Sequence, residues 1–138
     1  MMSLDTVIID EYGLDEFCKN VVDDIDGRCA NYCYPTRLRK LFEYAKQNGY
    51  DTVTTTLLYS IYQNHNFIKN YCEKLSKEFE IDFLYIDFRK GFWEGHNKAK
   101  ELGLYMQKYC GCVFSEEDRY VKKKKDNLSL PEGFEWKR

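Results

Sequence analysis

The sequence lacks any run of about 18 apolar residues, the length that a membrane-spanning helix requires. Its amino terminus also lacks the basic and then apolar pattern of a secretory signal. Acidic and basic residues nearly cancel, at a formal net charge of −2, so overall charge favours neither nucleic acid nor a membrane as a partner. We therefore expect a cytoplasmic protein that has no membrane partner and meets any nucleic acid through a local patch.

Internal repeats are also missing, and no glycine-rich phosphate loop follows a predicted strand. The second absence disfavours a nucleotide-binding hydrolase, because such enzymes hold phosphates with the backbone of a loop of this kind. At 138 residues the chain is long enough to bury one core but short for two domains.

Three segments have the β-branched and apolar character of short buried strands: residues 5–10, 50–58 and 82–87. Residues 1–4, ahead of the first strand, are interpreted as an expression leader. Between the strands, apolar residues recur at helical spacing and predict helices at 14–26, 37–48 and 67–79.

A last helix is predicted over residues 95–102, and Gly103 ends it. Alternating strands and helices are typical of an open parallel sheet with helices on both faces, so we predict a three-layer α/β domain over residues 5–120. Three strands make a small sheet, which another chain or further sequence would complete. Residues 121–138 form a charged tail that we expect to be mobile.

The loops after the second and third predicted strands hold the first candidate site residues. Ligands of open parallel sheets bind beyond the carboxyl ends of the strands. His65 and Asp87 occupy these loops, with Arg89 close behind. His65 is a candidate for proton transfer, although a lone histidine also serves as a structural residue or helix cap. Asp87 and Arg89 would converge on the same edge, or would simply form a salt bridge.

Six cysteines in a reducing compartment favour metal or redox chemistry over structural disulfides. Cys18 and Cys72 lie on apolar helix faces and are predicted to pack in the core. The other four form two pairs, Cys29 with Cys33 and Cys110 with Cys112.

Cys29 and Cys33 are spaced so that both thiolates can bind one metal, but two ligands do not complete a zinc or iron–sulfur site. Cys110 and Cys112 would supply the rest, or would close a tight disulfide that suits redox relay. The alternative for each pair is that its thiols are unrelated or inert.

Several quoted stretches occur together in one order and spacing: "RCANYCYPTRL", "FEYAKQNGYDTVTTTLLYS", "YQNH", "LYIDFRKGF" and "ELGLYMQKYCGCVFSEEDRY". In this combination, over about residues 7–120, the chain closely resembles the epoxyqueuosine reductase QueH family. The resemblance implies an open parallel α/β fold similar to the adenine-nucleotide α-hydrolase (HUP) fold. It also implies a two-electron reduction of epoxyqueuosine to queuosine at the wobble position of tRNA.

By the same resemblance, Cys29 and Cys33 match ligands of a [4Fe-4S] cluster. Whether a further iron ion binds beside the cluster stays open. Cys110 and Cys112 match a redox-active disulfide that would connect the cluster to an electron donor. His65 and Asp87 would then move protons or orient the substrate.

Two departures from the family accompany the resemblance. Three residues separate Cys29 from Cys33, where the family usually has two. The family also begins with a strand leading into an adjacent Cys-Cys pair that supplies further ligands, and no such stretch is present here. We therefore expect a fold truncated at its N-terminal strand, completed by a dimer partner or a complementing chain.

Basic and aromatic residues predict a patch that stacks on and neutralises a single-stranded RNA loop. Arg37, Arg89 and Lys108 would hold anticodon phosphates, and the plainer interpretation is solvated charges beside core aromatics. Two other functions stay open: a non-catalytic module in which the two cysteine pairs bind zinc, and a fragment that only binds RNA or protein.

Overall fold

The computed structural model describes residues 4–122, which divide into two compact units. The first extends to Lys90 and the second begins at Gly91. Residues 1–3 and 123–138, which hold most of the expected leader and tail, lie outside the described residues. Among the described residues, no helix is both long enough and apolar enough to cross a lipid bilayer.

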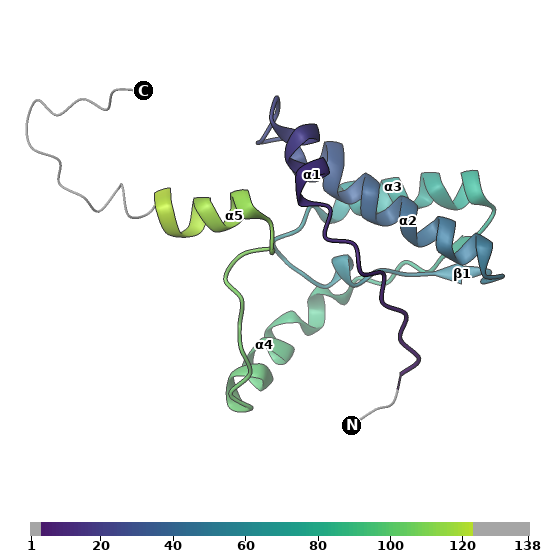
Figure 1. Ribbon diagram of the computed structural model, residues 1–138. Helices are drawn as coiled ribbons and strands as arrows, with labels where there is room; N and C mark the ends of the chain where they lie inside the picture. Colours follow the sequence, from purple (N-terminus) through teal and green to yellow (C-terminus); the bar gives the residue numbers. More distant parts are fainter. Residues whose placement is uncertain (1–3, 123–138) are drawn as a thin grey trace, which may run out of the picture. The chain divides into compact units, whose positions relative to one another are not determined.

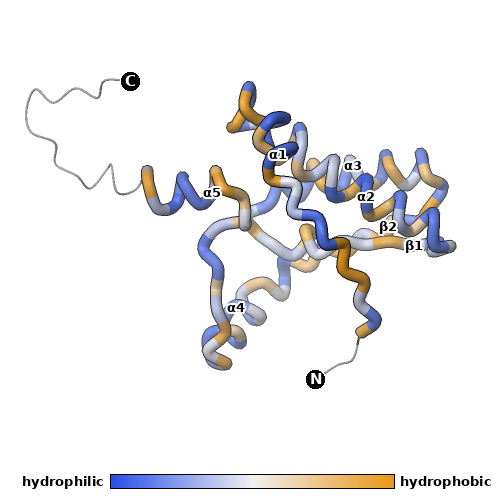
Figure 2. Tube along the Cα trace, in the orientation of Figure 1, coloured by the Kyte–Doolittle hydropathy of each residue, from blue (hydrophilic) through white to orange (hydrophobic). Residues whose placement is uncertain are grey.

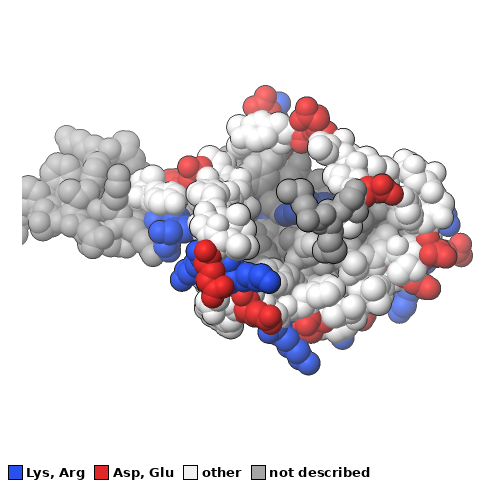
Figure 3. Space-filling view, turned by 90° about the horizontal axis from the view of Figure 1, so that it is seen from below, with Lys and Arg blue, Asp and Glu red and all other residues white. Residues whose placement is uncertain are grey.

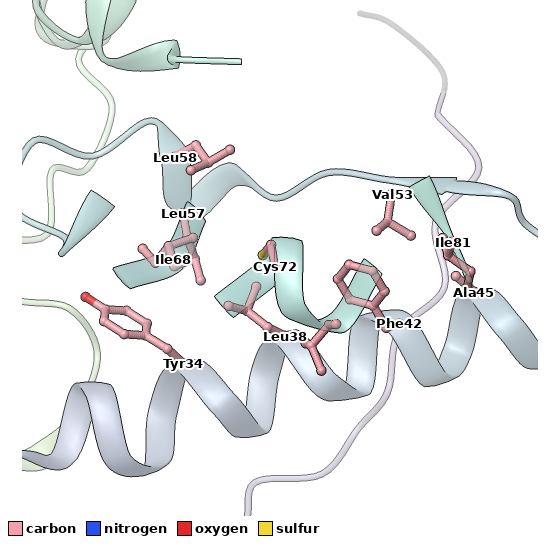
Figure 4. Close-up of a cluster of buried hydrophobic side chains, with 11 residues drawn as sticks. Tyr34, Leu38, Phe42, Ala45, Val53, Leu57, Leu58, Ile68, Cys72 and Ile81 are labelled. Atoms are coloured by element: carbon pink, nitrogen blue, oxygen red, sulfur yellow. The ribbon is translucent and has the colours of Figure 1, made fainter. Parts of the chain in front are cut away.

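The core of the first unit lies between two helices and a small sheet. Helices α2 (Tyr34–Gln47) and α3 (His65–Phe79) pack together on the same side of strands β1 (Thr52–Val53) and β2 (Asp82–Phe83) (Figure 1). Each helix has an apolar stripe along its length (Figure 2). The stripes and the strands bury one continuous cluster, much of which is labelled in Figure 4: Tyr34, Leu38, Phe42, Ala45, Val53, Leu57, Leu58, Ile68, Cys72, Leu75 and Ile81.

Strands β1 and β2 are parallel, and α3 connects them. Thr52 faces Asp82 and Val53 faces Phe83 in this register. The Leu84 amide extends the pairing by donating to the Val53 carbonyl oxygen at 2.9 Å. The predicted class, a mixed α/β fold with an open parallel sheet, is thus confirmed, but the described residues contain two strands of this sheet and not three. Because α2 and α3 lie on the same side of the strands, the predicted third layer is not observed among the described residues.

Residues 5–10 are irregular, so the predicted first strand is wrong. Its apolar residues are exposed, Ile8 to 82% and Val7 to 66%. β-Branched composition favours a strand only where a neighbouring strand pairs with it, and here the segment has none among the described residues. An ion pair from Glu11 to Lys40 connects the segment's end to α2.

Helix α1 (Leu14–Val21) ends five residues before the predicted boundary. The Asp24 side chain accepts hydrogen bonds from the Gly27 backbone amide at 3.0 Å and from the Asn31 side-chain Nδ2 at 2.9 Å. The bond between the aspartate and the Gly27 backbone competes with the helix and favours the turn that is observed.

The strand predicted over 50–58 is also shorter than expected. Thr55 accepts a hydrogen bond from the Leu57 amide and caps a short 3-10 turn, Thr56–Leu58, that stops β1. The predicted third helix begins at His65, two residues early, because the Asn64 side chain caps it by accepting from the Phe67 amide at 3.1 Å. Gly49, at a φ of 75°, follows α2 as predicted.

The second unit is built from short helices. Helix α4 (Phe92–Glu101) begins three residues before the predicted start, and Gly103 follows it at a φ of 65°. An irregular segment leads to α5 (Val113–Glu117) and a π-helical turn, Asp118–Lys122. No side chain of residues 91–121 is buried.

Candidate functional site

The two strands of the first unit end at one edge of the sheet, where a hydrogen bond joins the segments that follow them. Thr54 donates its hydroxyl proton to the Leu84 carbonyl oxygen at 2.9 Å. Beside this contact is a pocket of about 300 Å³, formed by side chains that follow both strands: Thr54, Thr55, Thr56, Tyr59 and Phe88. The structure therefore contains a cavity at the edge where parallel sheets bind ligands.

His65 is the first residue of α3 and is only 5% exposed. Tyr34 of α2 fixes the loop before it, because its hydroxyl accepts a hydrogen bond from the Asn64 amide at 3.1 Å and donates to Gln63. The motif "YQNH" is thereby held against α2.

His65 Nε2 lies 2.8 Å from the Tyr85 hydroxyl, and the two rings meet edge to face. Its other ring nitrogen, Nδ1, is buried and has no hydrogen-bond partner. An unpaired buried nitrogen costs roughly 1–3 kcal/mol. The tautomer of His65 decides whether Nε2 donates to the Tyr85 hydroxyl or accepts from it. The proton of this hydrogen bond can therefore lie on Nε2 or on the Tyr85 oxygen.

Sequence reasoning missed Tyr85. The Lys69 ammonium lies 4.6 Å from the centre of the Tyr85 ring, a cation–π contact that fixes the ring between α3 and the sheet edge. The available signal was its place in "LYIDFR", two residues before Asp87 at the end of a predicted strand.

Asp87 and Arg89 form the salt bridge that the sequence left open. Arg89 donates from Nε and Nη2 to the two carboxylate oxygens at 2.9 and 2.8 Å, and its amide donates to Oδ1 at 3.1 Å. The Arg89 hydrogen bonds hold the pKa of Asp87 well below its usual range. Asp87 is therefore ionised at neutral pH and is not a proton donor there.

Cys29 and Cys33 lie at the two ends of a π-helical turn, Cys29–Cys33, that runs into α2. The Tyr34 amide donates to the Cys29 carbonyl oxygen, a bond that encloses one more residue than an α-helical bond does. Both cysteines are half-buried. Helical residues four apart share a face, at roughly 5–6 Å between Cβ atoms, which suits two ligands of one metal.

The thiol pair by itself fits half of a metal site. Within residues 4–90, no third histidine, cysteine, aspartate or glutamate joins Cys29 and Cys33 closely enough to hold an ion. Zinc and iron–sulfur sites normally use about four protein ligands. The described part of this unit therefore supplies two ligands of the right kind and leaves the remaining positions to other groups.

Cys110 and Cys112 belong to the second unit and are thiols in this structure. Gly111 separates them at a φ of 91°, a conformation that favours glycine. Ser115 lies beside both: its Oγ accepts from the Cys110 amide at 3.1 Å and donates to the Cys112 carbonyl oxygen at 3.2 Å. The Cys110 thiol also points to this oxygen, at 3.2 Å. Sequence reasoning missed Ser115, whose only signal was its place three residues after Cys112.

The predicted phosphate-binding residues do not share one surface element. Arg37 is exposed on α2, Lys108 is exposed in the second unit, and Arg89 is held by Asp87. Figure 3 shows acidic side chains beside basic ones on the face in view. Arg39, two residues from Arg37, makes two hydrogen bonds to Glu78, at 2.9 and 3.1 Å.

Three of the predicted site residues therefore gather at the sheet edge: His65, Asp87 and Arg89. Cys29 and Cys33 lie on another element of the same unit, whereas Cys110, Cys112 and Lys108 belong to the second unit.

Comparison with known proteins gives matches over most of the chain. The family model described as "Epoxyqueuosine reductase QueH" matches residues 2–118. Proteins of that name in Dehalococcoides mccartyi and Thermotoga maritima are 36% identical over 121 residues and 37% identical over 97. A protein of the same name in Staphylococcus aureus is 28% identical over 101 residues.

These matches cover 88%, 69% and 70% of this chain, in the same order. They cover 66%, 50% and 42% of the three relatives. The chain thus spans between about two fifths and two thirds of the length of the relatives that it matches.

Proposed function

Because the chain belongs to the epoxyqueuosine reductase QueH family, we propose that it takes part in reducing epoxyqueuosine to queuosine in tRNA. The observation that carries the proposal is the family match over residues 2–118, which includes every site residue named above. The relatives carry the activity in their names, and a tRNA substrate implies a cytoplasmic reaction.

The reaction needs two electrons and two protons. Both carbon–oxygen bonds of the epoxide break, a carbon–carbon double bond forms, and the oxygen leaves as water. His65 moves one proton at Nε2, through the hydroxyl of Tyr85, since these two atoms are 2.8 Å apart. Asp87 stays ionised and keeps the Arg89 guanidinium in place beside this pair.

Cys29 and Cys33 are proposed as two ligands of a [4Fe-4S] cluster. When bound, such a cluster supplies electrons one at a time, and an iron with an open position polarises an oxygen as a Lewis acid. The π-helical turn supports this role, since it accommodates three intervening residues and still begins and ends with a thiol. A second copy of this chain would supply two more thiolates of the same kind, which makes four ligands.

Cys110 and Cys112 are proposed as the dithiol that passes electrons from an external donor. Oxidation of two thiols to a disulfide releases two electrons and two protons, the number that one epoxide consumes. The Ser115 hydroxyl, bonded to the backbone on both sides of Gly111, holds the two cysteines in one turn. We further propose that the first unit follows the HUP-like topology, since its helices and parallel strands alternate in that order.

The test is to reconstitute the protein anaerobically with iron and sulfide, and then to add tRNA that carries epoxyqueuosine and a chemical reductant. Iron, acid-labile sulfide and zinc are measured together with the visible spectrum, and nucleosides are quantified by mass spectrometry. We expect stoichiometric iron and sulfide, broad visible absorbance and formation of queuosine. A colourless protein that holds zinc, or one that binds tRNA without any metal, would instead support a non-catalytic module.

A matched pair of variants assigns the electron path. Cys110→Ser is expected to abolish turnover and to leave tRNA binding intact, whereas Cys18→Ser in α1 is expected to change neither. Full turnover by Cys110→Ser would remove the dithiol from the reaction.

A further inference from the structure

The pocket at the carboxyl end of β1 is small. Its volume of about 300 Å³ is at the lower limit of the roughly 300–1,000 Å³ that is typical of small-molecule sites. It therefore has room for one flat ring system.

The walls of the pocket are apolar although three threonines line it. Thr54 directs its hydroxyl to the Leu84 carbonyl oxygen, and the Thr55 hydroxyl caps the turn at Leu57. Both hydroxyl groups are thus hydrogen-bonded to the backbone, and the methyl groups of these two threonines line the cavity. No charged side chain lines the pocket, so its chemistry selects an uncharged ligand.

Two aromatic rings reach the pocket from different segments. Tyr59 follows the turn after β1, and Phe88 follows the segment after β2. Phe88 also packs against the buried core, which fixes its ring. Proteins bind unpaired RNA bases by stacking them on such rings, and every base offers a face for stacking.

We propose that this pocket binds the base of the target nucleotide, turned out of the anticodon loop and stacked on Tyr59 and Phe88. The inference rests on the proposed function for the identity of the RNA. Enzymes that act on a base take it out of the stack, and this pocket lies at the same sheet edge as His65 and Tyr85. The sugar and phosphates stay outside, where charged side chains can meet them.

The experiment measures binding by fluorescence anisotropy with two labelled anticodon stem–loops. One carries a 7-deazaguanine base at the wobble position, and the other has an abasic site there. We expect the protein to bind the loop with the base about 5- to 150-fold more tightly, the contribution of one stacked base.

Two pairs of variants locate the effect. Thr56→Phe fills the pocket and Tyr59→Leu removes a ring, so both are expected to abolish the preference for the base. Thr52→Phe and Tyr50→Leu make the same changes at the amino end of β1, where Thr52 and Tyr50 are exposed, and are expected to keep it. Circular dichroism checks that all four variants fold.

Equal binding of the two loops by the unaltered protein overturns the proposal, as does the absence of binding to either. So does a preference for the base that survives both Thr56→Phe and Tyr59→Leu. No reductant or turnover enters this measurement, so it is independent of the proposed reaction. If the protein prefers the base but never reduces epoxyqueuosine, the proposed pocket stands and the proposed function is refuted. If Thr56→Phe reduces epoxyqueuosine as fast as the unaltered protein, the proposed function stands and the proposed pocket is refuted.

Discussion

The two units differ in how they bury apolar side chains. In the first, Phe42, Leu58 and Ile68 are completely buried between helices and sheet, whereas no side chain of residues 91–121 in the second is buried. The two cysteine pairs follow this division. Cys29 and Cys33 lie on a turn continuous with a core helix, and Cys110 and Cys112 lie on a turn without a core of its own. The turn beside α2 thus holds the proposed metal ligands half-buried, whereas of the proposed redox thiols Cys110 is exposed and Cys112 is half-buried.

The largest expected effect separates the two units by stability. Phe42→Ala removes a completely buried ring from α2 and is expected to lower the free energy of unfolding by about 3–5 kcal/mol. Trp93→Ala in α4, where the side chain is 58% exposed, is expected to cost about 0.5 kcal/mol or less. Urea unfolding followed by circular dichroism measures both. Similar losses would show that the contrast in burial does not govern stability.

Thiol labelling should separate the units next. Cys110 is exposed and Cys72 is fully buried in the first unit's core, so Cys110 is expected to react with a water-soluble alkylating reagent at least about a hundredfold faster. Peptide mass spectrometry over time gives the two rates. Labelling in urea is the control, because the rates should converge once the core is lost, and equal rates in the folded protein would contradict a stable core.

A pH titration sharpens the same point. Burial raises the pKa of the Cys72 thiol from 9.0 to about 12. The folded protein therefore keeps a proton that the unfolded chain loses above about pH 9, and stability should fall as pH rises from there toward 12. Above pH 9 the unaltered protein is expected to lose roughly 1.4 kcal/mol per pH unit more than Cys72→Val. Parallel pH profiles from urea unfolding would exclude Cys72 as the cause.

The smallest expected effect concerns two arginines on α2 and rests on the proposed function. Arg37→Ala is expected to weaken binding of an anticodon stem–loop, and to reduce the slope of log affinity against log salt by about 0.7. Arg39→Ala should change neither, because Glu78 already neutralises Arg39. Anisotropy titrations at several salt concentrations test this. Equal effects of the two variants would remove Arg37 as a specific phosphate contact.

Helical periodicity predicted the elements that have a buried stripe, as α2 and α3 show. Their spacing encodes one apolar face, and the core that this face forms is observed. The strand predicted over residues 5–10 was wrong, because strand-like composition does not specify a neighbouring strand to pair with. Helix α1 and strand β1 ended early because single side chains, Asp24 and Thr55, bond the local backbone.

The candidate site divides in the same way. Strand order predicted that His65, Asp87 and Arg89 would gather at one edge, as they do. The role of Tyr85 could not be predicted, because it depends on the contact between the Tyr85 hydroxyl and His65 Nε2. These two residues are 20 positions apart in the sequence. The pocket likewise depends on Tyr59 and Phe88 from separate segments, a contact that spacing along the sequence does not encode.

The most direct test of the proposed function is made in cells that accumulate epoxyqueuosine because they lack its reductase. The chain and its Cys110→Ser variant are expressed there, and the ratio of queuosine to epoxyqueuosine in digested tRNA is measured by mass spectrometry. We predict that the unaltered chain shifts this ratio toward queuosine and that Cys110→Ser does not. Accumulated epoxyqueuosine that the unaltered chain leaves unchanged would contradict the proposal that it takes part in this reduction.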